Sequence, residues 1–155
     1  MKLRMLAVGS KMPAWVEEGV ETYRKRLPRD FSLEIEEIAL GQRGKNADVS
    51  KARLQEAERI NARLKGDEYL VALEVKGKAW STPQLASEAD QWRMQGKDVV
   101  LLVGGPDGLD PALSARADVA WSLSPLTLPH PLVRIMLAEQ LYRAWSLLVG
   151  HPYHR

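Results

Sequence analysis

The last three residues of the chain, Tyr153, His154 and Arg155, combine three different kinds of chemistry. An aromatic ring can stack on a nucleic-acid base, an imidazole can move a proton near neutral pH, and a guanidinium can balance negative charge. The three residues follow Gly150, which we expect to end a helix, and no aliphatic residue accompanies them. Because chain ends without such anchors are often disordered and dispensable, a tail without function is the competing interpretation.

Two more candidates for chemistry lie before the tail. His130 stands between two prolines, where a ring that fixes the loop by a hydrogen bond is the structural alternative, and Arg143 is a polar position in an otherwise apolar final segment. The chain has three histidines, all at or beyond position 130, and no cysteine. Disulfides, thiolate zinc sites and cysteine nucleophiles are therefore excluded, and we expect no metal site.

A glycine-rich loop offers a second kind of site. Residues 99–103 are continuously apolar, which is typical of a central strand in a parallel sheet. Gly104, Gly105 and Gly108 follow at once, and ligands of open α/β sheets bind at this end of the strands. With no Cβ in the way, a ligand could lie against the main chain there. A tight connection into the next helix is an equally good interpretation from this loop alone.

A proline-rich loop follows the fifth predicted strand. Three of the residues between positions 125 and 131 are proline, which fixes φ and removes amide donors, so the segment is expected to be rigid and irregular. A stiff crossover is the alternative to a binding loop. Its position favours binding, since a loop after strand five can lie beside the loop after strand four and complete a pocket.

Apolar patterning predicts the elements that position these loops. Strands are expected over residues 2–8, 31–38, 69–75, 99–103 and 119–123, with helices between them and a final helix over 132–149. This alternation predicts a mostly parallel five-stranded α/β sheet with helices on both faces, in one domain over residues 1–155. A dinucleotide-binding fold is disfavoured because only Gly9 follows the first strand.

Charge and length limit the partners. The chain has 155 residues and a net charge of +2; residues 1–65 carry 14 Lys and Arg against 10 Asp and Glu, and the remainder carries 8 against 10. The asymmetry permits a polyanion partner without requiring one. The glycine-containing loop 40–48, with Arg43 and Lys45, could meet an RNA backbone or serve as a solvated connector, and it lacks the spacing of a phosphate loop. No membrane span or signal-peptide pattern is found, so we expect a cytoplasmic protein.

The final predicted helix carries two apolar stripes instead of one. The first is Ile135, Ala138, Tyr142, Trp145 and Val149, and the second is Val133, Leu137, Leu141, Ala144 and Leu148. A surface helix of a monomer needs only one such stripe. We therefore expect one stripe to pack on the sheet and the other to meet a second subunit in a symmetric dimer, with a helix simply buried in the core as the alternative.

Five motifs in order resemble one known family. They are AVGSKMPAWV, GQRGKNAD, VGGPDGL, LSPLTLPHPLVR followed by AEQLYRAW, and the terminal HPYHR. Together they cover essentially the whole chain and are similar to the RlmH family, the pseudouridine N3-methyltransferases of large-subunit ribosomal RNA within the SPOUT class. Each motif alone would be weak evidence, but five at the right spacing are specific.

The resemblance implies a trefoil knot near the C-terminus, a homodimer and S-adenosylmethionine as methyl donor. Periodicity did not indicate the knot, which base rates disfavour. The family's cofactor contacts carry over to Leu73, Gly104, Leu123, Ser124, Pro125, Leu126, Thr127 and Leu128. The implied partner is ribosomal RNA, and because the chain has no separate RNA-binding domain, an assembled ribosome is the favoured substrate.

The chemistry that follows is methyl transfer to a ring nitrogen that must lose a proton, which a nearby cation would favour. Candidate catalytic residues are His130, Arg143, Tyr153, His154 and Arg155. Among them Arg155 or Arg143 suits electrostatic stabilisation, His154 proton transfer and Tyr153 stacking on a base. A non-catalytic dimeric RNA-binding factor, or an α/β enzyme for another nucleotide-like ligand, remains the alternative; neither predicts binding of S-adenosylmethionine.

Overall fold

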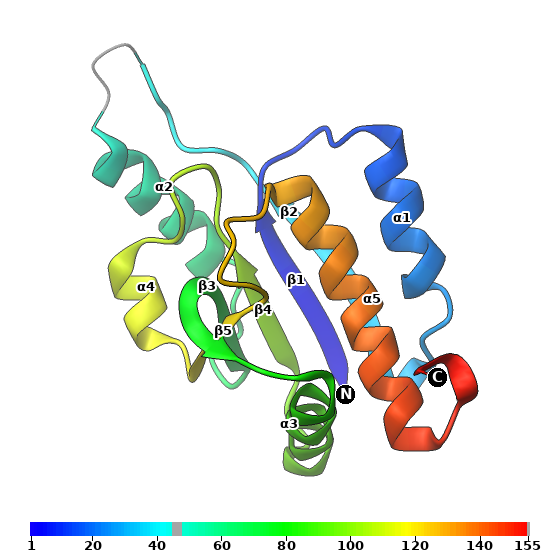
Figure 1. Ribbon diagram of the computed structural model, residues 1–155. Coiled ribbons are helices and arrows are strands. Elements are labelled where there is room, and N and C mark those ends of the chain that lie inside the picture. The colour runs from blue at the N-terminus through cyan, green and yellow to red at the C-terminus, as the bar shows by residue number, and fades with distance from the viewer. Residues whose placement is uncertain (45–47, 155) are drawn as a thin grey trace.

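One five-stranded parallel sheet organises the chain (Figure 1). The computed structural model describes residues 1–44 and 48–154, so Lys45 and Arg155 of the sequence analysis lie outside the described residues. The strands are β1 (Lys2–Val8), β2 (Ser32–Ile38), β3 (Tyr69–Ala79), β4 (Val99–Val103) and β5 (Val119–Ser122). Their order is β2-β1-β4-β3-β5, and every pairing is parallel. The predicted parallel five-stranded α/β sheet is confirmed.

Helices cover both faces of this sheet. They are α1 (Ala14–Arg24), α2 (Val49–Asn61), α3 (Thr82–Gln95), α4 (Pro111–Arg116) and α5 (His130–Val149), with short 3-10 turns η1 (Arg29–Phe31) and η2 (Pro152–His154). Alternate strand residues point to opposite faces. On β4, Val99, Leu101 and Val103 pack with α1, α3 and α5, whereas Val100 and Leu102 pack with α2 and α4. This two-sided burial explains why residues 99–103 are apolar without interruption.

Local sequence signals set the helix ends. The Asp48 carboxylate accepts a hydrogen bond from the Ser50 amide at the start of α2. Ser81 and Gln84 form a reciprocal capping box at the start of α3. Gly96 and Gly150 end α3 and α5 with φ of 70° and 73°, a left-handed conformation that glycine adopts without strain. α5 begins two residues earlier than predicted, at His130.

β3 is longer than its predicted range of residues 69–75. It leaves its register with β5 after Leu73 and returns, so that both Leu73 and Lys78 pair with Trp121. A Cβ on Gly77 would lie 2.7 Å from the Ala120 carbonyl carbon, so the return requires glycine. The residues Lys76, Gly77 and Lys78 resemble an exposed loop in sequence, and this is why the pattern ended the strand too early. At this bend, residues 73–75 of β3 line the cavity described below.

α5 packs between α1 and α3 against the sheet (Figure 1). Leu137, Leu141 and Ala144 of one apolar stripe are fully buried, and so is Ala138 of the other. Both stripes therefore contribute to the core of a single chain, and the pattern by itself does not require a second subunit. Among the described residues, no helix is long and apolar enough to cross a membrane.

Candidate active site

A cavity of about 620 Å³ opens beside the bend of β3, at the carboxyl ends of β4 and β5. Parallel neighbouring strands present their carboxyl ends at the same edge, so the loops that follow them meet there. Leu73 and Glu74 come from β3, Gly104 and Gly105 follow β4, and Leu123 follows β5. The glycine loop and the proline-rich loop therefore lie together, as the sequence predicted.

The lining is largely apolar with a few polar groups. Seven of the eight residues predicted for cofactor binding line the cavity: Leu73, Gly104, Leu123, Ser124, Leu126, Thr127 and Leu128. Pro125 lies in the same loop but is not part of the lining. Trp121 and Val133 extend the apolar wall, and Glu74 places a carboxylate at the cavity. The arrangement suits a flat, mostly apolar molecule with a few polar contacts.

The glycine loop is shaped by its own backbone. The Gly108 amide donates to the Gly105 carbonyl at 3.1 Å, and Gly108 has φ of 78°. A Cβ on Gly104 would lie 2.6 Å from the Gly108 carbonyl carbon and 2.7 Å from the Leu109 nitrogen. Gly104 is therefore needed for the turn to close on itself. The expectation that its missing Cβ makes room for a ligand was wrong in its physical reason, although the residue does line the cavity.

His130 fixes the glycine loop from inside the fold. Its Nδ1 lies 3.1 Å from the Gly104 carbonyl oxygen, and its Nε2 lies 2.8 Å from the Nε of Arg134. Because arginine can only donate, Nε2 must accept and Nδ1 must carry the proton. Burial, helped by the charge of Arg134, lowers the pKa of His130. The ring is therefore neutral and both nitrogens are engaged, which matches the loop-fixing interpretation.

Arg134 is a structural residue that the sequence analysis missed. It is 4% exposed, and besides His130 it donates to Glu37 at the end of β2 and to the carbonyl of Gly9 after β1. One guanidinium thus ties the ends of two strands to the start of α5. Arg134 lies four residues after His130 in an apolar helix, and this spacing could have predicted that the two side chains are neighbours.

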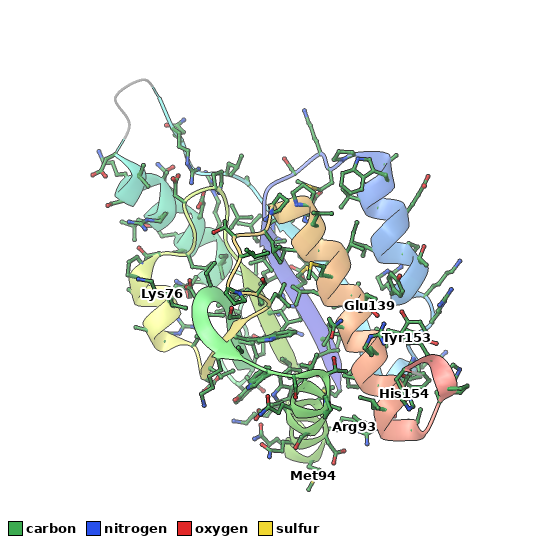
Figure 2. The ribbon with its side chains drawn as sticks, in the orientation of Figure 1. Lys76, Arg93, Met94, Glu139, Tyr153 and His154 are labelled. Carbon is green, nitrogen blue, oxygen red and sulfur yellow. The ribbon has the colours of Figure 1, made fainter. Side chains whose placement is uncertain are left out.

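The tail folds back along α5 toward the middle of the helix (Figure 2). The Tyr153 hydroxyl donates to Glu139 at 2.9 Å, and the Tyr153 and Tyr142 ring centres are 4.6 Å apart. Burial and the hydrogen bond to Glu139 raise the pKa of Tyr153 to about 12. The phenol therefore stays protonated at neutral pH. Tyr153, for which the sequence predicted stacking on a base, thus packs on Tyr142 of its own chain.

Glu139 also holds Arg143. The Arg143 Nε donates to Glu139 Oε1 at 2.8 Å, and its guanidinium carbon lies 5.0 Å from the centre of the Tyr153 ring. The positive charge of Arg143 is therefore already paired with a carboxylate of its own chain. The Nδ1 of His154 is buried and has no hydrogen-bond partner in the described part of the chain. Three of the predicted catalytic residues thus gather at one place, organised by a glutamate that the sequence analysis did not single out.

The two groups of predicted site residues lie at different positions along α5. His130 is its first residue and contacts the cavity, whereas the tail follows its last. Even where the tail folds back along the helix, its Tyr153 hydroxyl contacts Glu139, nine residues after His130 and therefore about 14 Å from it. Figure 1 shows the same separation, with the C-terminus far from the loop that precedes α5. One chain therefore does not bring its own tail to its own cavity.

Comparison with known proteins decides the family. The family model described as "Predicted SPOUT methyltransferase" matches residues 1–154. The ribosomal RNA large subunit methyltransferase H of Chromohalobacter salexigens is 65% identical over 155 residues, covering 100% of both chains. The chain belongs to the RlmH family of SPOUT methyltransferases. Relatives in the RlmH family with the same name include those of Hahella chejuensis, 60% identical over 100% of this chain and 99% of that protein, and Pseudomonas putida, 59% identical over the full length of both.

Solved structures agree on the fold. A methyltransferase from Legionella pneumophila in complex with bound S-adenosylmethionine superposes with a TM-score of 0.52 at 16% identity, covering 93% of this chain and 66% of that one. A methylase family protein from Haemophilus influenzae gives a TM-score of 0.54 at 10% identity, covering 97% of this chain and 67% of that one. At these identities the likeness concerns the fold of this RlmH-family chain. The family resemblance read from the five motifs is confirmed.

Proposed function

We propose that this chain transfers a methyl group from S-adenosylmethionine to N3 of a pseudouridine in large-subunit ribosomal RNA. Full-length identity of 65% to a ribosomal RNA large subunit methyltransferase supports the activity. The observation that carries the proposal is the cavity beside the bend of β3 and the ends of β4 and β5, whose lining includes seven of the eight residues predicted to hold the cofactor. A ribosomal substrate also implies that the reaction takes place in the cytoplasm.

The cavity fits the cofactor in size and chemistry. Its volume of about 620 Å³ lies within the roughly 300–1,000 Å³ range of small-molecule sites. Leu73, Leu123 and Leu128 offer apolar walls to an adenine ring, and Gly104 and the loop 123–128 offer main-chain groups to its polar edge. When bound, the sulfonium supplies an electrophilic methyl group. We also propose that these two loops belong to the trefoil knot of the SPOUT class.

The chain's own residues must align the target nitrogen and remove its proton. His154 is proposed to take the proton and Tyr153 to stack on a base. Arg143 is paired with Glu139, which leaves Arg155 as the better candidate for stabilising the anion of the target base. His130 is proposed to position the glycine loop, because both of its ring nitrogens are engaged within the fold.

A homodimer would unite the two halves of the site. The Tyr153 hydroxyl of the tail contacts Glu139, nine residues after His130 and therefore about 14 Å from it along α5. A two-fold axis crossing α5 would bring the end of one helix beside the start of the other, and each tail would then reach the partner's cavity. Exposed apolar side chains are available for the contact: Trp15 on α1 and Leu132 and Val149 at the two ends of α5.

Subunit complementation tests this arrangement. Leu73→Trp should fill the cavity, and deletion of residues 153–155 should remove the tail, so each homodimer should be inactive. A mixed dimer contains one intact cavity facing one intact tail, and it should recover up to half of the wild-type rate of methyl transfer to ribosomes. If the mixed dimer is as inactive as its parents, each site is built from one chain and the dimer proposal fails.

A further inference from the structure

α2 carries a buried carboxylate outside the cavity. Glu56 on α2 is 2% exposed, and its Oε2 accepts hydrogen bonds from the Gly41 amide at 2.9 Å and from Nη1 of Arg43 at 2.7 Å. A carboxylate removed from water is destabilising unless it is paired and hydrogen-bonded. Arg43, in the connection between β2 and α2, thus pairs its partly exposed guanidinium with this buried carboxylate.

The same guanidinium reaches the wall of the cavity. The Nε of Arg43 donates to Asp107 Oδ2 at 2.8 Å, across 64 positions of sequence. Asp107 lies in the turn 105–108, and its neighbours Pro106 and Gly108 line the cavity. Both carboxylates raise the pKa of Arg43, whose charge is therefore permanent. Since a guanidinium is planar and rigid, it fixes Asp107 relative to α2.

The turn needs an external support. It contains two glycines, and Gly104 precedes them, so its backbone has more freedom to lose on ordering than most loops. His130 holds it on the inner side through the Gly104 carbonyl. On the outer side, Asp107 is the turn's charged side chain, and Arg43 is its partner.

The geometry points to Arg43 as a positioning residue for the cofactor: through Asp107 it holds the turn 105–108 in its binding conformation. The inference rests on the proposed function of the cavity. Arg43 does not line the cavity and acts only through the turn. A loop that is already ordered loses less entropy on binding, so the ion pair should strengthen cofactor affinity without touching the reacting atoms.

Asp107→Asn tests this by removing the charge and keeping the shape. The dissociation constant for S-adenosylmethionine, measured by calorimetry, should rise about 5- to 20-fold, a typical range for such coupling. The KM for S-adenosylmethionine should rise similarly while kcat at saturation stays unchanged. Because Asp107 is partly exposed, the melting temperature should change little.

Two further variants make the result decisive. Arg43→Lys keeps a positive charge paired with Glu56 but loses the planar guanidinium that also binds Asp107. It should weaken cofactor binding in the wild-type protein and have little further effect in a protein that already carries Asp107→Asn. Arg63→Gln, which breaks an exposed ion pair with Glu36 of β2 that does not line the cavity, is the matched control and should leave binding unchanged. The inference is overturned if Asp107→Asn binds S-adenosylmethionine with wild-type affinity, or if the two substitutions have additive effects in the double variant. It is also overturned if Arg63→Gln loses as much affinity as Asp107→Asn. Failure of the wild-type protein to bind S-adenosylmethionine would instead overturn the proposed function.

Discussion

Replacing His130 by Leu separates positioning from catalysis. The variant keeps a side chain of similar bulk at the start of α5 but loses the donor to the Gly104 carbonyl and the acceptor for the Arg134 Nε. Arg134 is almost fully buried, so its Nε has no water to replace the ring. Its bonds to Glu37 and Gly9 remain, which keeps the charge itself paired.

The expected loss follows from these two hydrogen bonds. The neutral bond contributes about 1 kcal/mol, and leaving a buried charged donor unsatisfied costs about 1–3 kcal/mol, so the free energy of unfolding should fall by about 2–4 kcal/mol. For a chain of this size that corresponds to a decrease in melting temperature of roughly 4–16 °C. The protein should still fold, since domains are typically stable by about 5–15 kcal/mol. Because the glycine loop loses its inner support, S-adenosylmethionine should bind more weakly as well.

Urea denaturation and calorimetric titration of the same preparations measure both effects. His151→Leu, at an exposed histidine in the tail, is the control and should cost less than about 1 kcal/mol. A His130→Leu protein with wild-type stability and cofactor affinity but no methyl transfer would refute the positioning role. His130 would then return to the list of residues that handle the proton.

Three more predictions concern the same structure. Burial and the charge of Arg134 lower the pKa of His130, so below about pH 6.5 the unfolded chain takes up a proton that the folded chain resists. The free energy of unfolding by urea should therefore be fully retained above that pH and should decline toward acid. A decline of equal size in His130→Gln would exclude this cause. Gly104→Val should yield a destabilised protein by thermal denaturation, because its side chain meets the backbone of the turn, and a stable protein that merely fails to bind would point back to a cofactor clash. Deleting residues 153–155 should lower methyl transfer to ribosomes at least ~100-fold and leave cofactor affinity unchanged. The melting temperature should fall by only a few degrees, because Tyr153 loses its contacts with Glu139 and Tyr142. Full activity would exclude a catalytic tail.

Much of the fold could be predicted from the chain because its local signals agree with its packing. The five strands and their parallel arrangement follow from apolar runs separated by capped helices, and the glycine loop lies at the end of a central strand as expected. β3 was cut short because Lys76 and Lys78 look like a loop. The pattern could not reveal that Gly77 lets the strand return so close to Ala120.

The site was predictable in its members but not in their arrangement. The motifs placed Gly104 and the loop 123–128 together, and the cavity contains nearly all of the expected residues. The long-range partners were invisible, since neither the contact of Arg134 with Gly9 nor that of Arg43 with Asp107 leaves a periodic signal. The separation of the tail from the cavity depends on the length and direction of α5 in the fold.

The most direct test of the proposed function is to locate the methyl group in the product. Large-subunit ribosomes that lack the modification are incubated with the protein and labelled S-adenosylmethionine, and the ribosomal RNA is digested and analysed by mass spectrometry. We predict one methyl group per particle, on N3 of a pseudouridine, and much less transfer to naked ribosomal RNA. A methyl group on a ribose or on another base, or no transfer to ribosomes by a protein that binds S-adenosylmethionine, would contradict the account.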